Sequence, residues 1–285
     1  DKALFETGVT WIEKETGIPV LGILPWLKEI FPPEDSLDLL EREQINQSAE
    51  IEIGIIKLPR ISNFSDLDPF FGESSIQIRW IELGQNIGKP DVLIIPGSKQ
   101  TIKDLDSLNK MGMTTQIKDY AKNGGTIFGI CGGLQMLGKS LEDPYKKESL
   151  SELSPLSNKG MNLLPIKTIF GETKQTSQRE EIVSWPETKK VRGFEMHYGK
   201  SNLINNENLN IISLFKNTSL GWILEKKDKS FIGGTYLHGI FENDEWRHQW
   251  INKLRQKKGL NKLNPNKENN IKKRERLLDL LTDSF

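Results

Sequence analysis

The sequence has very few of the side chains on which disulfides and metal sites depend. Its 285 residues include one cysteine, Cys131, and three histidines, His197, His238 and His248. A single cysteine excludes an intramolecular disulfide and a cysteine-cluster metal site, and three histidines leave little for a histidine-rich one. We therefore expect no metal site in this chain.

An excess of charge and a long apolar run are also missing. Lys and Arg number 39, as do Asp and Glu, so the net charge is zero. This balance argues against a nucleic-acid or anionic-membrane surface built on bulk charge. No apolar run approaches the roughly 18–20 residues of a membrane-spanning helix, and no signal-peptide pattern is present. We expect a cytoplasmic protein without nucleic-acid or membrane partners, and, since the first residue is Asp1, a piece of something longer.

The middle of the chain alternates apolar strand-like segments with a helix-like one. The apolar runs are nearly continuous, which is typical of strands buried on both faces of a parallel α/β sheet. The helix-like segment covers residues 114–123. The expected strands cover residues 51–58, 76–83, 92–95 and 126–130, followed by weaker ones at 164–170, 192–196, 220–224 and 231–237.

The two ends of the sequence differ from this middle part. A helix is expected over 5–15 and a short buried strand over 20–24, followed by an irregular and polar segment over 30–47. This order resembles the last strand and helix of one domain with a linker. From residue 255 the chain is rich in Lys and Asn, which is typical of a solvated tail. The expected parts are 1–47, 48–254 and 255–285.

Cys131 stands where an apolar strand ends, and Gly132, Gly133 and an apolar helix start follow it. This is the pattern of a nucleophile elbow, a strained strand-to-helix turn that needs small neighbours because the backbone is tightly folded. The helix N-terminus favours a thiolate and offers N–H groups to a developing oxyanion. A cysteine elsewhere is more often a small apolar core residue, but the flanking glycines favour a nucleophile here.

A thiolate mechanism needs an imidazole to hold and return a proton. His238 follows the apolar segment 232–237 and precedes Gly239, so it also lies at the end of a strand. His197 ends another expected strand and is the rival base, whereas His248 lies in an amphipathic segment and is expected at a helix surface. The spacing alone leaves His238 and His197 open.

A second strand-end loop carries Gly97 and Ser98, between Pro96 and Lys99. Its backbone N–H groups are placed to complete an oxyanion hole opposite that of Gly132. The loop lacks the Gly-x-x-x-x-Gly-Lys-Ser/Thr spacing of a phosphate loop, and the rest of the chain lacks it too. We therefore expect no ATP site in this chain.

Together these residues resemble the class I, or triad-type, glutamine amidotransferases, and among them the cobyric acid synthases, which amidate the corrin ring. The Cys-Gly-Gly elbow is shared by several amidotransferases, whereas the Leu-Pro-Arg-Ile-Ser-Asn-Phe stretch and the Tyr-Leu-His-Gly motif are much more specific. The matching segments are 58–64 with Asp66 and Asp68, 96–99 with Thr101, 129–138, Asp143 and Pro144 with Glu148, 160–165, 193–199 and 235–241.

The resemblance implies a flavodoxin-like α/β amidotransferase domain with a mostly parallel sheet, preceded by the tail of an amidoligase domain. It implies that Cys131 attacks the side-chain amide of glutamine, giving a glutamyl thioester and ammonia, and that His238 is the general acid and base. Backbone N–H groups of Gly97 or Ser98 and of Gly132 would stabilise the oxyanion.

The same resemblance implies which residues bind glutamine. Gln135, four residues after the nucleophile, would contact the substrate, and His197, Tyr198 and Gly199 would line its pocket. Most class I amidotransferases carry a glutamate two residues after the histidine to orient it, whereas this chain has Ile240 there, as the corrin-amidating branch does. This departure implies a Cys–His dyad with weak activity until a partner domain engages, and it leaves Glu195 as a conceivable substitute.

The resemblance further implies that ammonia passes to an amidoligase domain of dethiobiotin-synthetase-like fold, which binds ATP and Mg. Residues 1–47 would be the remnant of that domain, so this chain would hold no cofactor. The complete enzyme would amidate the b, d, e and g carboxylates of adenosylcobyrinic a,c-diamide. Alternatives are the glutaminase half of cobyrinic a,c-diamide synthase or of the enzyme amidating lipid-linked peptidoglycan precursors, a cysteine hydrolase on the same scaffold, and a non-catalytic binding domain.

Overall fold

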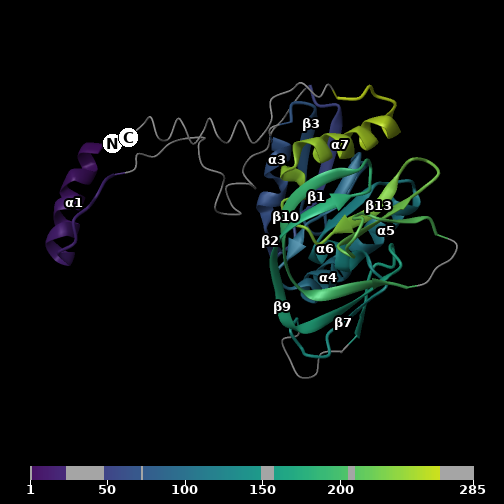
Figure 1. The fold of residues 1–285 in the computed structure, drawn as a ribbon, viewed down its shortest axis with the longest axis horizontal. Helices are drawn as coiled ribbons and strands as arrows, with labels where there is room; N and C mark the ends of the chain where they lie inside the picture. The colour runs from purple at the N-terminus through teal and green to yellow at the C-terminus, as the bar shows by residue number, and fades with distance from the viewer. Residues whose placement is uncertain (1, 24–47, 72, 149–156, 205–208, 264–285) are drawn as a thin grey trace.

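The centre of the molecule is a seven-stranded sheet (Figure 1). The computed structural model describes residues 2–23, 48–71, 73–148, 157–204 and 209–263. Five neighbouring strands are parallel, and two antiparallel strands extend the sheet beyond β13. The strand order is β11 (Ile211–Ser213), β12 (Gly221–Glu225), β13 (Phe231–Thr235), β6 (Ile127–Ile130), β4 (Val92–Ile95), β1 (Ile51–Ile56) and β3 (Ile76–Ile81).

The central strands β6 and β4 are buried along their whole length, and β1 nearly so. A strand covered on both faces needs apolar side chains at successive positions, which is why these segments are made mainly of Ile, Leu, Val and Phe, with the half-buried Glu52 as the one charged residue. The register sets Ile53 beside Val92 and Ile94 beside Phe128. The mostly parallel sheet expected from the sequence is therefore confirmed.

Helices pack against this sheet, and α7 (Asp244–Lys258) contributes two buried tryptophans to the core. The ring centroid of Trp250 lies 5.7 Å from that of Phe128. This helix continues beyond residue 255, where the sequence predicted the polar tail to begin. Arg255 itself is buried, and its guanidinium lies 2.6 Å from Glu50. Further helices that the structure describes beside the sheet include α4 (Thr101–Lys110), α5 (Met113–Lys122) and the short α6 (Gly132–Leu137).

The sequence predicted α5 but missed α4. The buried face of α4 includes Thr101 and Asp104 beside Leu105 and Leu108. Two polar residues on the inner face break the apolar period by which a helix is recognised. Among the helices that the structure describes, none is long and apolar enough to cross a membrane.

A second sheet lies beside the carboxyl edge of the first and is dominated by one long antiparallel pair, β9 (Ile166–Val183) and β10 (Lys189–Leu203). The sequence predicted only short parts of both strands, 164–170 and 192–196. The rest of β9 is largely polar and solvent-facing, so it shows no apolar run. The two smaller strands are β7 (Ser140–Glu142) and β8 (Ser157–Lys159).

The beginning of the chain agrees with the sequence only in part. The expected helix over 5–15 is confirmed as α1 (Lys2–Thr16), which leaves Phe5 and Trp11 exposed. The strand expected over 20–24 is wrong for residues 20–23, which form no strand, and Leu21 is 97% exposed. An apolar segment becomes a strand only when another strand pairs with it, and within the described residues none does. The expected segment 30–47 lies outside the described residues.

Candidate active site

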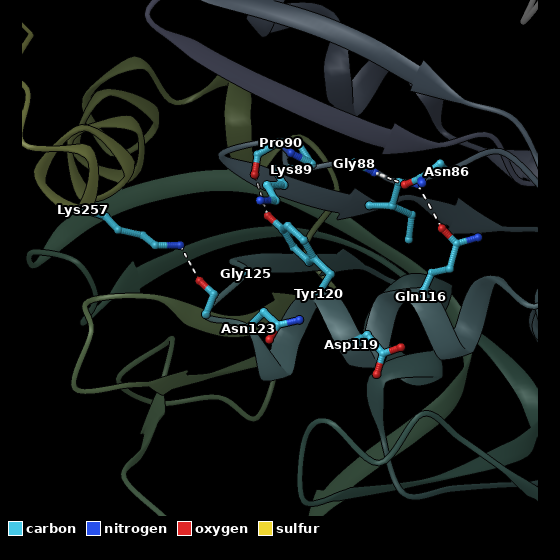
Figure 2. Close-up of a pocket in the computed structure, with 12 residues that line it drawn as sticks. Asn86, Gly88, Lys89, Pro90, Gln116, Asp119, Tyr120, Asn123, Gly125 and Lys257 are labelled. Carbon is cyan, nitrogen blue, oxygen red and sulfur yellow. Dashed lines mark hydrogen bonds between the residues drawn. The ribbon is translucent and has the colours of Figure 1, made fainter.

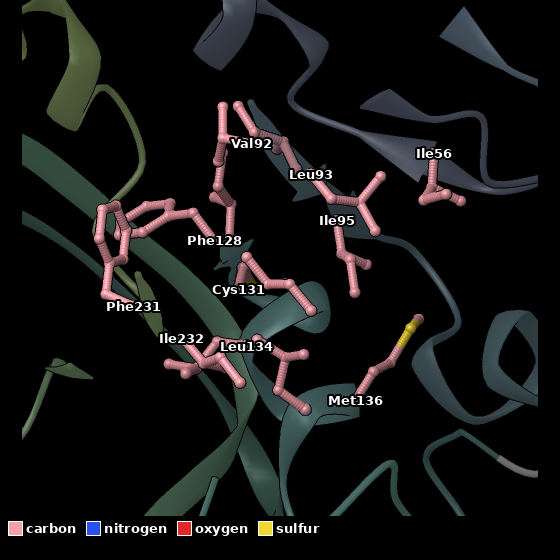
Figure 3. Packing of buried hydrophobic residues seen from close by; sticks show 14 of the residues in the cluster. Ile56, Val92, Leu93, Ile95, Phe128, Cys131, Leu134, Met136, Phe231 and Ile232 are labelled. Carbon is pink, nitrogen blue, oxygen red and sulfur yellow. The ribbon is translucent and has the colours of Figure 1, made fainter. Parts of the chain in front are cut away.

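Cys131 occupies a strained turn between β6 and α6, as the sequence predicted. Its backbone has φ 49° and ψ −106°, a conformation that residues other than glycine rarely adopt. The backbone N–H of Cys131 donates to the carbonyl oxygen of Thr235 at 2.7 Å, which ties the turn to the end of β13. Figure 3 shows Cys131 among the buried side chains that include Ile95 and Leu134. The thiol sulfur lies 3.8 Å from the carbonyl oxygen of Met196 on β10.

The three residues predicted to form an oxyanion hole lie together beside this turn. Gly97 and Ser98 form the short strand β5 (Gly97–Ser98), which pairs with β2 (Ile61–Ser62). A Cβ atom on Gly132 would lie 3.0 Å from the backbone nitrogen of Ser98. A Cβ atom on Gly97 would lie 3.5 Å from Cε1 of His238.

His238 is buried at the end of β13 and is held from several sides. Its backbone N–H donates to the carbonyl oxygen of Phe194 at 2.9 Å, and its carbonyl oxygen accepts the Phe194 N–H at 3.1 Å. The two rings are stacked, with centroids 5.1 Å apart. The imidazole Nδ1 lies 2.7 Å from Oδ2 of Asp66, and the neighbouring Cys131 is among the groups that raise the pKa of the imidazole. Of the two histidines that the sequence left open, His238 is therefore the one beside the thiol.

The protonation of His238 follows from these neighbours. Burial by itself lowers its pKa, but the hydrogen bond with Asp66, the charge of that carboxylate and the interaction with Cys131 outweigh that effect and raise the pKa to about 10. The imidazole is therefore a cation at neutral pH. A cationic imidazole beside a cysteine stabilises the thiolate and holds a proton ready for a leaving group.

Two residues that sequence reasoning left without a role also contact His238. Asp66 lies on the short helix η1 (Phe64–Leu67), and its Oδ1 accepts the backbone N–H of Gly239 at 2.7 Å. Asn63, with φ 48°, places Nδ2 3.1 Å from Nε2 and 3.3 Å from Nδ1 of the histidine. Both belong to or follow the family-specific stretch 58–64. The sequence identified that stretch as specific to the family, but nothing in it indicated a contact with His238.

The rival pair His197 and Glu195 forms a separate cluster. His197 lies with Nε2 3.0 Å from Glu195 and donates from Nδ1 to the carbonyl oxygen of Gly199 at 2.7 Å. Burial is the main cause that lowers the pKa of His197, although Glu195 acts in the opposite direction. Glu195 also forms an ion pair with Arg179. The hypothesis that Glu195 orients His238 is therefore wrong, because its carboxylate is occupied by His197 and Arg179.

Gln135 is buried behind the nucleophile, and its amide already has protein partners. Thr101 donates to its Oε1 at 3.1 Å, and its Nε2 donates to the hydroxyl of Tyr236 at 3.1 Å. A Cβ atom on Gly199 would lie 2.4 Å from the same Nε2, so Gly199 packs against this amide. Tyr198 differs from its neighbours because its side chain is exposed.

Two further features lie away from this cluster. His248 is half-buried on α7, with Nε2 3.1 Å from Glu73. A hollow of about 670 Å³ lies before the first residues of β4 and β6, at the edge of the sheet opposite Cys131 (Figure 2). Pro90, Tyr120 and Lys257 are among its lining residues. Within the described residues, no group of three or more His, Cys, Asp or Glu side chains is placed to hold a metal ion.

Known proteins match both the sequence and the fold of this chain. Residues 52–246 match the family described as CobB/CobQ-like glutamine amidotransferase domain. Two proteins of Prochlorococcus marinus, from strains NATL1A and NATL2A, are 79% and 80% identical to the chain over all of its length, and both are named cobyric acid synthase. The chain spans 58% and 56% of the lengths of these relatives. A crystal structure of a glutamine amidotransferase has the same fold, with a TM-score of 0.51 and 13% sequence identity, over 73% of this chain and 99% of that one.

Proposed function

Because this chain belongs to the CobB/CobQ-like glutamine amidotransferase family, we propose that it hydrolyses glutamine and supplies the ammonia to an amidation reaction. The observation that carries this proposal is Cys131 on its strained turn, beside the buried imidazole of His238, whose pKa is raised. A nucleophile with its proton donor in place is what acyl transfer from an amide requires.

In the proposed first half-reaction, the Cys131 thiolate attacks the side-chain carbonyl carbon of glutamine. The resulting oxyanion accepts hydrogen bonds from the backbone N–H groups of Gly97 or Ser98 and of Gly132. The imidazolium of His238 then gives its proton to the departing nitrogen. The carbon–nitrogen bond breaks, ammonia leaves, and a glutamyl thioester on Cys131 remains.

Water completes the proposed cycle. His238, now neutral, takes a proton from the water that attacks the thioester carbonyl. The carbon–sulfur bond breaks, glutamate leaves, and the thiolate and imidazolium are restored. No metal or redox step enters this sequence of reactions.

Glutamine recognition is assigned to the residues around Gln135. Within the part of the chain that the structure describes, Nε2 of Gln135 donates to Tyr236, and the second N–H of the same amide is assigned to the substrate. His197, Tyr198 and Gly199 follow Met196, whose carbonyl lies beside the thiol, so this stretch of β10 is in position to line the pocket.

The destination of the ammonia is proposed from the relatives, which are named cobyric acid synthase. In the complete protein, an ATP- and Mg-dependent amidoligase part would use the ammonia on the b, d, e and g carboxylates of adenosylcobyrinic a,c-diamide. The reaction would take place in the cytoplasm, where thiols stay reduced. No ATP-dependent step is assigned to the residues of this chain.

Ammonia release from glutamine by the full-length protein, with ATP and corrin substrate present, tests the proposal. We expect release that Cys131→Ala abolishes, and asparagine in place of glutamine should give none. Release that persists without Cys131 contradicts the thioester mechanism. Hydrolysis of peptides or esters without any use of glutamine would instead support a cysteine hydrolase.

A further inference from the structure

We propose that Asp66 is the positioning residue for His238 and that it replaces the glutamate which similar amidotransferases carry two residues after their histidine. The inference rests on the proposed function, since it assigns a residue to the same reaction. It adds a third group, from a different part of the chain, to a site that was expected to work with a cysteine and a histidine alone.

The position two residues after the histidine, where an orienting carboxylate is expected, holds no carboxylate in this chain. Residue 240 is isoleucine, begins the helix η2 (Ile240–Glu242) and is 1% exposed. Glu195, the other carboxylate considered for the role, is taken up by His197 and Arg179. A histidine that receives a proton from a thiol must still be held with Nδ1 protonated, so that Nε2 faces the sulfur.

Asp66 meets this requirement with both of its oxygens. Oδ2 accepts the hydrogen bond from Nδ1 of His238 at 2.7 Å, and Oδ1 accepts the N–H of Gly239 at 2.7 Å. The carboxyl group is buried, so water does not compete for either contact. One contact fixes the ring, and the other fixes the backbone directly after it.

The helix that carries Asp66 is itself fixed against the site. Asn63 caps η1 in a left-handed backbone conformation and sets its amide over both ring nitrogens. Ser62, in β2, pairs with Gly97 of the loop assigned to the oxyanion. The stretch 58–64 therefore joins the proposed oxyanion loop to the group that orients the base.

The two contacts of Asp66 make a specific prediction for Asp66→Asn. Gly239 supplies a backbone N–H, which needs an oxygen, so the amide oxygen stays on that side and the amide NH2 turns toward His238. An NH2 group facing Nδ1 requires Nδ1 to be the acceptor, which moves the ring proton to Nε2. In that tautomer Nε2 no longer takes the proton of the thiol, and the geometry is otherwise kept.

The charged groups facing His238 define the expected pH dependence. The groups around it that can titrate are Asp66 on η1, Cys131 at the start of α6 and His197 on β10, while Asn63 and Phe194 cannot. The imidazolium must give a proton to the departing ammonia, so activity falls above the pKa of His238. Loss of Asp66 removes an acceptor of the cation, lowers that pKa, and moves the alkaline fall in activity to lower pH.

Steady-state kinetics of the full-length protein over a range of pH test the proposal. We expect Asp66→Asn to lower kcat for ammonia release by roughly 10²–10⁴-fold, with KM for glutamine within about threefold and the alkaline limb at lower pH. Asp66→Glu keeps the carboxylate, so its kcat should be at least about tenfold higher than that of Asp66→Asn. Asp106→Asn is the control, because it removes the same charge from an exposed residue of α4, and it should leave kcat unchanged.

A second measurement needs neither turnover nor a variant at position 66. In protein labelled with ¹⁵N-histidine, the NMR signal of His238, identified by its loss in His238→Gln, should titrate well above pH 8 and show a hydrogen-bonded Nδ1–H. Titration near the ordinary histidine value of about 6.5 overturns the proposal, as does Asp66→Asn with wild-type kcat and an unmoved alkaline limb. A wild-type protein that releases no ammonia but shows the high titration would contradict the proposed function and leave the role of Asp66 standing.

Discussion

Gly133 lies so close to the carbonyl oxygen of Ile95 that a Cβ atom at position 133 would stand 1.9 Å from it. The contact joins the first turn of α6, just after the nucleophile, to the last residue of β4, just before the loop of Gly97 and Ser98. The elbow and the proposed oxyanion loop are therefore held together by direct backbone packing. This close packing explains why the second residue after Cys131 is glycine, which the geometry of the turn alone does not.

Gly133→Ala should accordingly destabilise the protein and disturb the site. Because the obstacle is backbone rather than a movable side chain, we expect the free energy of unfolding to fall by about 1–3 kcal/mol or more. Urea denaturation measures this loss, and ammonia release should fall with it. Gly171→Ala is the control, since its nearest atom would lie at an ordinary 3.4 Å. Equal stability of the two variants contradicts the packing argument.

Tyr236→Phe should reduce stability through the hydrogen bonds behind the nucleophile. The Tyr236 hydroxyl accepts from Gln135 and lies 2.6 Å from the hydroxyl of Ser201, and all three residues are buried. Removing it leaves a buried amide donor without its partner, which costs roughly 1–3 kcal/mol. Tyr145→Phe, at a side chain 54% exposed, should have no measurable effect in the same denaturation experiment. A loss equal to that of Tyr145→Phe would show that the Gln135 amide does not depend on this hydroxyl.

Glu148 should make stability depend on pH. Burial, with the nearby negative charges of Asp143 and Asp104, raises its pKa from 4.5 to about 7, against the opposing hydrogen bond from the Ile102 N–H at the start of α4. The folded protein therefore keeps this proton to higher pH than the unfolded chain. The free energy of unfolding consequently falls as pH rises from about 4.5 through 7.

Glu148→Gln removes that titration. We expect the difference in free energy of unfolding between pH 5 and pH 8 to shrink by about 1–3 kcal/mol relative to the wild type. Urea denaturation at the two pH values measures it. The same pH dependence in both proteins would contradict the assignment to Glu148.

The parts of this site that the sequence predicted are those that depend on neighbours in the chain. A continuous apolar strand followed by Gly132 and Gly133 identifies Cys131, and a strand end identifies His238 without settling its rivalry with His197. The resemblance to the amidotransferases then assigned the nucleophile to Cys131 and the general acid and base to His238. Polar stretches of β9 and the mixed inner face of α4 gave no apolar pattern, so their extent came only from the structure.

Asp66 lay beyond sequence reasoning for a different reason. It is 172 positions from His238, and the two meet only because η1 folds over the end of β13. The residue two positions after the histidine is Ile240, so the sequence predicted a Cys–His dyad, with Glu195 as a conceivable substitute for the missing carboxylate. A role that moves to a distant element leaves no trace in local spacing.

The central claim is that Cys131 forms a covalent glutamyl intermediate, and trapping at that residue tests it most directly. The full-length protein is incubated with 6-diazo-5-oxo-L-norleucine, an electrophilic glutamine analogue, digested, and examined by mass spectrometry. We expect one added group on the peptide that contains Cys131, slowed by excess glutamine and absent in Cys131→Ala. An unmodified Cys131 peptide in protein that releases ammonia from glutamine would contradict the account.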